Sequence, residues 1–580
     1  MLSIAMIVVC AIVVVGAVVA RRASAAAAAL ADVIEYAEVI KADLASADLD
    51  ALADDLGTLD DRTQSLLTAV SDPVLSAGVD GIPYAGAHLR AARTVASAIA
   101  GLTAAARPLS TVLPALEPEQ LVVDGVYDTD TLSEFDGTIR DVEDQLSIST
   151  KQLASIDTDA LDARFAKAVD SVASALDSAD TLVGQIEPLV GILPILLDQS
   201  ESHDWMVVLQ NLAEARGTGG ILGAYAVLHV EGGSLSMISH GSDRDLISTA
   251  VPSDGVSDDL KALWGGSIDD IRSVNVSPNF PYAGQLWANG LEAATGQSVD
   301  GVLAFGQGIV QYLLAATGPV TIEGQTIDAE NVVSFLSLGV YAQFPDATDK
   351  NAFVSELVAE IFSRLQAGQF DLPSLLSATA TTTTSDRLLA WSPVADIESS
   401  IEAAGYAGEL STDYGPDVAV AVNNGSGNKL EQFLHVDVDY ALGTCDEEYL
   451  RQGSVEITLT NEAPTSGLPA YVTPRLDRSD APVGSTLEIV SVYAPVGSGN
   501  PDETLDGEDV EGYVGTETGR PLYVFTVDLD PGQSRTLVLN WLEPTAGPTV
   551  ADVLSTTPQV TVPPTLVPWT VTAEEAAQCG

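Results

Sequence analysis

Polar residue types that could bind an anion gather in one segment of the chain. Asn211, Glu214 and Arg216 follow a strand-like run, and a glycine cluster that includes Gly219 and Gly220 comes next. The cluster does not match the dinucleotide-binding fingerprint, because position 222 is a leucine and a strand is expected to follow it. A glycine-rich turn can still present backbone N–H groups to an anion. The segment therefore predicts either an anion site or a tight loop in which Arg216 pairs with an acid such as Glu214.

A second cluster, Ser239–Asp245, contains Asp243, Arg244 and Asp245. Arg216 and Arg244 each follow a strand-like segment, so both could meet at one edge of a sheet. Two guanidinium groups there would suit bidentate phosphate binding, and Asp243 or Asp245 could hold a divalent cation such as Mg²⁺. The alternative interpretation of the Asp-Arg-Asp run is a surface ion pair.

Other motifs limit the chemistry. The loop Asn275–Pro281 predicts either a helix entry capped by Ser or Asn, or a ligand contact at Asn275. The sequence contains no G-x-S-x-G elbow, which argues against a hydrolase triad, and no Walker-type Gly-Lys-Ser/Thr. Its five histidines are scattered without ligand-type spacing, so a zinc site is not predicted.

The charge balance excludes one class of partner. The chain of 580 residues has 82 acidic against 24 basic residues, a net charge of -58. Such a surface repels nucleic acid, which needs clustered Lys and Arg to release counterions. A solubility bias of exported proteins would explain the excess, as would attraction of cations or cationic surfaces. With 46% hydrophobic and only 18% charged residues the chain is not largely disordered, and its length predicts several cores.

The N-terminal residues predict a membrane anchor. Leu2–Ala20 is apolar apart from Ser3, which is about the length needed to cross a hydrocarbon core of roughly 30 Å. The rival signal peptide usually has a shorter apolar region and a small-residue cleavage site. Arg21 and Arg22 follow the segment, where the positive-inside rule would place cytoplasm. We resolve this conflict with the hypothesis that a short basic stretch precedes Met1, which leaves a single-pass protein with its bulk outside the cytoplasm.

Two cysteines fall in the region expected outside the cytoplasm. Cys10 lies in the apolar segment, whereas Cys445 and Cys579 lie far beyond it. An oxidising environment allows such a pair to form a disulfide, which would tie the C-terminus to an upstream strand. Sequence alone leaves this disulfide candidate open, because the distance between the two Cα atoms decides it.

The chain predicts a multidomain fold in four parts. Residues 1–22 are the single transmembrane helix, 23–197 an α-helical stalk or bundle, 198–412 an α/β domain and 413–580 a β-sandwich. In the stalk, the helices expected between Pro- and Gly-containing breaks are Ala23–Ala69, Ala87–Ala104, Asp130–Ser155 and Asp157–Gly184. In the α/β domain, strands interleave with helices, which implies an αβα-type sheet covered by helices on its faces. In the last part, alternating segments separated by Gly, Pro, Asn and Asp turns are typical of a sandwich.

The chain resembles a family known only as domain of unknown function 4012, found in exported, membrane-anchored bacterial proteins. The residues that carry the match are Gln210–Asn211, Glu214, Arg216–Gly220, Asp243–Asp245, Asn275–Pro281, Val299–Val302 and Gly318–Val320, with Asn424 and Lys429–Leu430 in the last part. The resemblance implies an architecture but no established activity.

Residues 204–365 also resemble, more distantly, the LytR-CpsA-Psr phosphotransferases. Those enzymes move glycan polymers from polyprenyl-pyrophosphate carriers onto peptidoglycan, with arginines on the pyrophosphate and an acid-bound Mg²⁺. The resemblance implies that Arg216, Arg244 and Lys350 would hold a pyrophosphate and that Asp245 would complete the catalytic set. The sequence departs from that pattern: Thr218–Gly219 stands where an acid is expected, Asp243 replaces a proline, and Lys350 replaces an arginine.

Two hypotheses follow. In the first, the protein is a wall-glycan phosphotransferase, with Arg216, Arg244 and Asp245 catalytic and Asn211, Glu214, Gly219, Gly220, Asn275 and Lys350 contacting the substrate. In the second, the protein is a non-catalytic envelope scaffold or binding protein with a degenerate phosphotransferase-like domain, and its partners are membrane, lipid-linked glycan or peptidoglycan. Convergence of Arg216 and Arg244 on one pocket would favour the first hypothesis.

Overall fold

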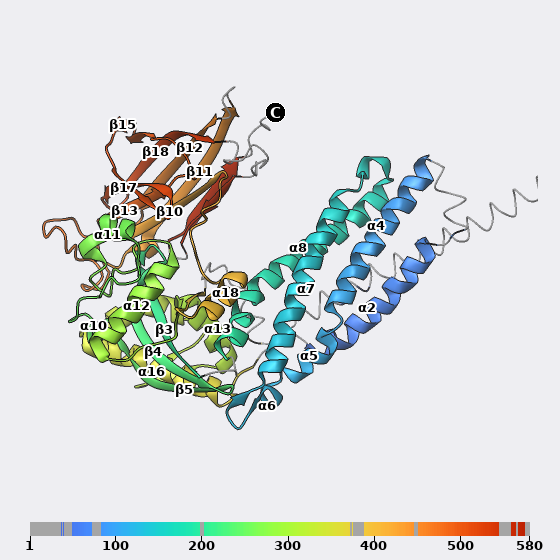
Figure 1. Ribbon diagram of the computed structural model, residues 1–580, viewed down its shortest axis with the longest axis horizontal. Helices are drawn as coiled ribbons and strands as arrows, with labels where there is room; N and C mark the ends of the chain where they lie inside the picture. The colour runs from blue at the N-terminus through green and yellow to red at the C-terminus, as the bar shows by residue number, and fades with distance from the viewer. Residues whose placement is uncertain are drawn as a thin grey trace, which may run out of the picture. The chain divides into compact units, whose positions relative to one another are not determined.

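The computed structural model describes residues 36, 39, 49–71, 73, 83–197, 202–371, 374, 388–445, 450–544, 558–563 and 567–574. It is a multidomain chain of helices and several β-sheets (Figure 1). Two compact units are distinguished, Met1–Leu197 with Ala367–Thr382, and Asp198–Gln366 with Thr383–Gly580. The expected anchor at residues 1–22 and Cys579 lie outside the described residues. Cys445 ends strand β11, but its side chain is not among those described.

The first unit is helical. Its long helices run side by side, with α2 against α4, α4 against α7 and α7 against α8 (Figure 1). A short hairpin of β1 (Val122–Val123) and β2 (Val126–Tyr127) precedes α7. The helices are α2 (Leu49–Val70), α4 (Pro83–Ala106), α5 (Leu109–Ala115), α6 (Pro118–Leu121), α7 (Thr129–Ala154), α8 (Ala163–Val190) and α9 (Ile192–Leu196), with a 3₁₀ turn at Thr158–Ala160.

Helix α7 illustrates how the sequence builds this unit. Asp128 caps the helix by accepting from the backbone N–H of Thr131. Leu132, Phe135 and Ile139 begin a row of buried residues at three- and four-residue spacing. Two expected helix limits were wrong, the start of one helix at Ala87 and the end of another at Gly184. Helix α4 already begins at Pro83, where the fixed φ of proline suits a first helical turn, and α8 continues past Pro188 to Val190.

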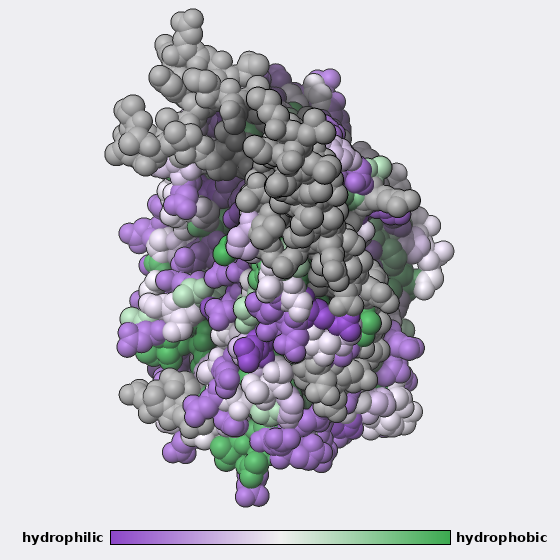
Figure 2. Space-filling view, turned by 90° about the vertical axis from the view of Figure 1, so that its right-hand side faces the viewer, coloured by the Kyte–Doolittle hydropathy of each residue, from purple (hydrophilic) through white to green (hydrophobic). Residues whose placement is uncertain are grey.

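One helical stretch of the described chain meets the requirements of a membrane span by length and composition alone. It is Tyr84–Ala115, and a third of its most apolar window is buried inside the protein. Because α4 packs against α2 and α7, a bundle core explains its apolar residues equally well. On the face drawn in Figure 2, the described residues are mostly hydrophilic, and hydrophobic residues form small separate patches.

The second unit contains a sheet with strand order β5-β4-β3-β6-β9. Strand β3 pairs antiparallel with β4 and parallel with β6. The strands are β3 (His203–Arg216), β4 (Gly219–Glu231), β5 (Ser234–Ser242), β6 (Gly301–Phe305) and β9 (Leu389–Trp391), with a separate hairpin of β7 (Val320–Ile322) and β8 (Gln325–Ile327).

Helices cover both faces of this sheet. Met206 and Val208 point to a core that contains Trp287 of α12, whereas Leu209 points to a second core with Leu357 of α16, as the alternation of a strand requires. The helices are α10 (Asp243–Leu246), α11 (Asp258–Trp264), α12 (Phe280–Thr295), α13 (Gln307–Thr317), α14 (Val332–Ser334), α15 (Val340–Gln343), α16 (Ala347–Gln366) and α18 (Ala395–Ala403), with a 3₁₀ turn at Gly265–Ser267 and a π-helical turn at Phe335–Gly339.

The last part of the chain is built from strands. Two sheets, with orders β16-β17-β13-β10-β19 and β15-β14-β18-β12-β11-β20, share one hydrophobic core. Their strands are β10 (Asp417–Asn424), β11 (Leu434–Cys445), β12 (Leu450–Asn461), β13 (Thr486–Tyr493), β14 (Asp502–Leu505), β15 (Glu508–Asp509), β16 (Tyr513–Glu517), β17 (Arg520–Leu529), β18 (Ser534–Pro544), β19 (Gln559–Thr561) and β20 (Trp569–Glu574). The short turn η4 (Glu431–Phe433) lies before β11.

The glycine-rich segment differs from the expected loop. Strand β3 continues through Arg216 with an irregular register between Asn211 and Ala215, and Gly217–Thr218 forms the turn to β4. The glycines permit close backbone approach. A Cβ atom on Gly220 would lie 2.3 Å from the carbonyl oxygen of Asn211, which no other residue could accommodate.

Candidate functional site

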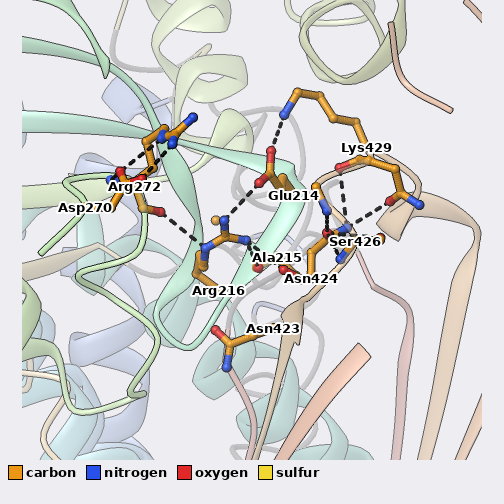
Figure 3. Close-up of polar contacts among 12 residues, drawn as sticks. Glu214, Ala215, Arg216, Asp270, Arg272, Asn423, Asn424, Ser426 and Lys429 are labelled. Carbon is orange, nitrogen blue, oxygen red and sulfur yellow. Dashed lines mark hydrogen bonds and ion pairs between the residues drawn. The ribbon is translucent and has the colours of Figure 1, made fainter. Parts of the chain in front are cut away.

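An ion network lies at the end of β3. Glu214 accepts from Nη2 of Arg216 at 2.9 Å through one carboxylate oxygen and from the ammonium of Lys429 through the other. Figure 3 shows Glu214 between these two cations. All three residues are buried, with 7%, 7% and 8% of their surface exposed. Since Lys429 belongs to the strand-rich last part, the network joins that part to the α/β sheet.

The remaining contacts of Arg216 are also to the protein. Its Nη1 donates to the carbonyl oxygens of Ala215 at 2.8 Å and Asn424 at 3.5 Å, and its Nε donates to that of Arg272 at 3.3 Å. The pairing of Arg216 with Glu214 is the structural alternative that the sequence left open. Arg216 is therefore directed to acceptors within the protein.

The electrostatics of the network are balanced by its own members. Burial acts to raise the pKa of Glu214, but the nearby charges of Lys429 and Arg216 outweigh it and lower that pKa to about 2. Burial opposes the charged form of Lys429, yet the attraction of Glu214 raises the pKa of its ammonium above the usual value. Glu214 and Lys429 thus stay charged at neutral pH, and each acts as counter-ion of the other.

The turn at Gly217–Gly220 between β3 and β4, here called the glycine hairpin, is held by amide side chains. Asn275 donates to Thr218 Oγ1 and to the carbonyl oxygen of Gly220, both at 2.9 Å, and Gln210 accepts from the N–H of Gly220 at 2.9 Å. The N–H of Gly217 donates to Asn423 Oδ1 at 2.9 Å. Asn275 is fully buried. The N–H groups of Gly217 and Gly220 are thus directed to protein amides, and Asn275 positions the hairpin.

The second cluster forms the short helix α10. Asp245 accepts from the backbone N–H of Ser242 at 2.7 Å, so its carboxylate caps the helix. Arg244 is exposed. Because Arg216 is buried within the ion network and Arg244 lies on the surface, these two side chains occupy different environments. Burial raises the pKa of Asp243, against the opposing pull of Lys350 and Arg272.

Lys350 lines a small cavity of about 30 Å³, enough for one or two water-sized groups. Asn211, Gln307 and Tyr341 are also in its wall. Asn211 Nδ2 donates to the Tyr341 hydroxyl at 2.5 Å, and Asn211 Oδ1 accepts from Gln307 Nε2 at 3.3 Å. Asn351, the neighbour of Lys350, donates to Ser242 Oγ at 2.9 Å. This bond ties helix α16 to the end of β5.

The ammonium of Lys350 lies 5.4 Å from the ring centroid of Tyr341. Among the described residues, no carboxylate forms an ion pair with it. Burial, with repulsion from Lys429, lowers the pKa of Lys350 to about 8, and Asp243 opposes this change. A partly buried cation with a lowered pKa beside polar side chains is a feature of binding sites.

An apolar groove of about 740 Å³ lies on the same tyrosine. Tyr341 and Tyr471 stack with ring centroids 5.2 Å apart, and Tyr471 comes from the strand-rich part. The other lining residues are mainly small or apolar: Leu338, Gly339, Ala342, Pro345, Gly467, Leu468, Pro469 and Ala470. Tyr341 therefore lines both the groove and the Lys350 cavity.

The donor set for a divalent cation does not fit at Asp243 and Asp245. Asp245 is engaged as a helix cap, and the charged groups that act on Asp243 are Lys350, Arg272 and Lys429. Mg²⁺ prefers several oxygen ligands with little competing positive charge. Within the described ranges, no group of three or more His, Cys, Asp or Glu residues could hold a metal ion.

Of the residues singled out in the sequence, the structure brings Asn211 and Lys350 to one cavity and pairs Glu214 with Arg216. Sequence reasoning did not single out Tyr341 or Gln307. Lys429 was singled out only by its place in the family resemblance. No spacing rule could connect these residues, because Tyr341 lies 130 residues after Asn211 and Lys429 lies 215 residues after Glu214.

Comparison with curated proteins and with solved structures finds no match. The resemblance to the LytR-CpsA-Psr phosphotransferases is not shown by these comparisons and stays a prediction. Residues 200–341, which include β3, the glycine hairpin, α10 and Tyr341, match the model of the family described as "Protein of unknown function (DUF4012)". The similarity to this family therefore covers that region of the chain.

Proposed function

We propose that this protein is a membrane-anchored protein of the bacterial cell envelope that binds a polyprenyl-pyrophosphate-linked glycan without transferring it. In this proposal residues 1–22 are the anchor and the helical unit is a stalk. The α/β domain and the β-sandwich lie outside the cytoplasm and carry the binding site. This site is centred on Tyr341.

One observation carries the proposal: Tyr341 lines both a groove of mainly small and apolar side chains and a small cavity whose wall includes Asn211, Gln307 and Lys350. A lipid pyrophosphate has a similar division into an apolar chain and an anionic head, and since the cavity admits only one or two water-sized groups, the head would contact Lys350 and extend outside the cavity. The groove is of a size that usually buries much of a small ligand. Lys350, which has no ion-pair partner in the described chain, supplies the positive charge for an anionic group.

Binding without transfer is favoured by the state of the residues that the phosphotransferase resemblance makes catalytic. Arg216 is directed to protein acceptors, Arg244 is exposed and Asp245 caps a helix. Transfer of a phosphoryl group depends on positioned positive charge around the phosphate. Only Lys350 of the candidate cations combines a cavity position with a free ammonium, so the geometry supports a grip on an anion more than it supports catalysis.

The test is the affinity of the full chain for farnesyl pyrophosphate, measured by isothermal titration calorimetry with farnesol and inorganic pyrophosphate as separate arms. We expect binding of farnesyl pyrophosphate to exceed that of either fragment. Lys350→Met should weaken it by at least tenfold, about 1.4 kcal/mol. Tyr471→Ala should weaken farnesyl pyrophosphate and farnesol alike, because it removes part of the groove.

Arg364→Ala is the matched control. Arg364 is a cation of the same helix α16 whose guanidinium donates to Glu360 and to the backbone at Thr317, and it should leave binding unchanged. Equal affinity in the Lys350→Met variant and the natural chain would reject the site. Release of a monophosphate from the bound probe would contradict binding without transfer and would favour the transfer hypothesis.

A further inference from the structure

Two buried acids lie near the ion network of Glu214, Arg216 and Lys429. Glu431 in η4 and Glu488 in β13 are each 1% exposed. One oxygen of each carboxyl group has a partner: Glu431 accepts from Asn424 Nδ2, and Glu488 accepts from Thr486 Oγ1 at 2.6 Å. The second oxygen of each is buried without a hydrogen-bond partner among the described residues. Unpaired buried polar atoms are costly, so a missing proton or ion is indicated.

The pair is connected to the contact between β3 and the strand-rich part. Asn424 stands opposite Glu488 in the β10–β13 ladder, its side chain holds Glu431, and its carbonyl oxygen accepts from Arg216. The buried groups here carry unequal charge. Glu214, Glu431 and Glu488 are three acids, whereas Arg216 and Lys429 are two cations. One positive charge is therefore lacking if all five are ionised.

Neighbouring groups favour a proton over a metal ion as that charge. The orientation of the Asn424 amide is fixed, because its Oδ1 accepts from the backbone N–H groups of Ser426 and Gly427. Its Nδ2 donors therefore point toward Glu431, where a metal ion would need an oxygen. Arg475 and Arg216 also act on Glu488. Arg475 is itself paired with Asp477 and Asp528.

We propose that Glu431 and Glu488 share one proton in the folded protein, and that loss of this proton loosens the contact between β3 and the strand-rich part. One proton on either carboxyl group would neutralise one of the two unpaired buried carboxylate oxygens. It would also remove the surplus negative charge behind Glu214. The inference concerns this contact between β3 and the strand-rich part, here called the joint, and does not depend on the proposed ligand.

The direction of the pH effect follows from burial. Burial raises the pKa of both carboxyl groups, Glu488 to about 7, and the negative charges of Glu488 and Glu214 raise that of Glu431 further. The folded chain then holds more protons than the unfolded chain between about pH 4.5 and the raised pKa values of the two groups. The joint is accordingly most stable at or below about pH 4.5 and weakens as the pH rises through 7.

The experiment is hydrogen exchange of the full chain, followed at the amide of Gly217, which donates across the joint to Asn423. After correction for intrinsic exchange rates, its protection should fall more than tenfold between pH 5 and pH 8. Glu488→Gln should remove this pH dependence, because the amide is neutral at any pH and the pair then no longer carries two negative charges at high pH. Glu398→Gln is the control. Burial also raises the pKa of Glu398 to about 7, but this carboxylate accepts from the backbone N–H of Ser392 and is not part of the contact between β3 and the strand-rich part.

Two results would overturn the proposal. The first is a flat protection profile for Gly217 in the natural chain, a measurement that needs no variant to fold. The second is the same pH dependence in Glu488→Gln as in the natural chain. Loss of the pH dependence in Glu398→Gln would also count against it, because the titrating group would then lie elsewhere.

Discussion

Lys429 and Lys350 approach the ring of the same residue, Tyr341, at 5.9 and 5.4 Å, yet their environments are opposite. Lys429 has a carboxylate partner in Glu214, and the pKa of Lys429 is raised. Lys350 has no ion-pair partner within the described residues, and burial lowers its pKa to about 8. Lys429 therefore depends on Glu214 as its counter-ion, because removing one partner of a buried ion pair leaves an uncompensated charge, whereas Lys350 is the cation that we propose to contact an external anion. Both lysines lie near Tyr341, so only their ion-pair partners and pKa values distinguish them.

The largest expected effect comes from removing the counter-ion of the locked pair. Glu214→Ala leaves the buried charges of Arg216 and Lys429 without their carboxylate, which should lower the free energy of unfolding by about 3–5 kcal/mol. Urea titration of the full chain measures it. Glu360→Ala removes the half-exposed partner of Arg364 and should cost only about 0–1 kcal/mol. A loss from Glu214→Ala as small as that of the control would show that the network does not hold the joint.

Part of the secondary structure could be predicted from the sequence. The helix expected at Asp130–Ser155 agrees with α7 (Thr129–Ala154), because helical spacing of apolar residues is a local signal. The segment after Gln210 was expected to be a loop, and it is strand up to Arg216. Its Ala-Glu-Ala-Arg run has no strand propensity of note. Pairing with β4 and contacts to Asn423 and Asn424 override that preference.

The candidate site could be predicted only in part. The sequence pointed to Asn211 and Lys350, and both line the cavity. It also paired Arg216 with Arg244 as one site, since each follows a strand. In the structure Arg216 is buried and donates to the carbonyl oxygen of Asn424, whereas Arg244 is exposed, and no local pattern signals this difference. Tyr341 was missed because a tyrosine in an apolar helical run reads as ordinary core.

The affinity for farnesyl pyrophosphate should depend on pH through the charge of Lys350. Because the pKa of Lys350 is about 8, its positive charge is lost as the pH rises above that value, and affinity for farnesyl pyrophosphate should fall roughly tenfold from pH 8.5 to 9.5. Lys350→Arg keeps its charge throughout this range and should bind with little change. Calorimetric titrations at constant ionic strength decide the matter. An identical decline in both proteins would assign the titration to another group.

The smallest effect is expected at Arg244, and it tests whether cations of the second cluster matter at all. Arg244 is exposed on α10, so its charge is screened by water, and Arg244→Ala should change the free energy of unfolding by no more than about 0.5 kcal/mol. Its effect on farnesyl pyrophosphate should be about twofold or less, because the exposed charge of Arg244, although it helps to lower the pKa of Lys350, is screened by water. Raising the salt concentration should abolish even that difference, while the effect of Lys350→Met persists. A tenfold loss in Arg244→Ala would instead bring Arg244 to the ligand and revive the two-cation site that the sequence suggested.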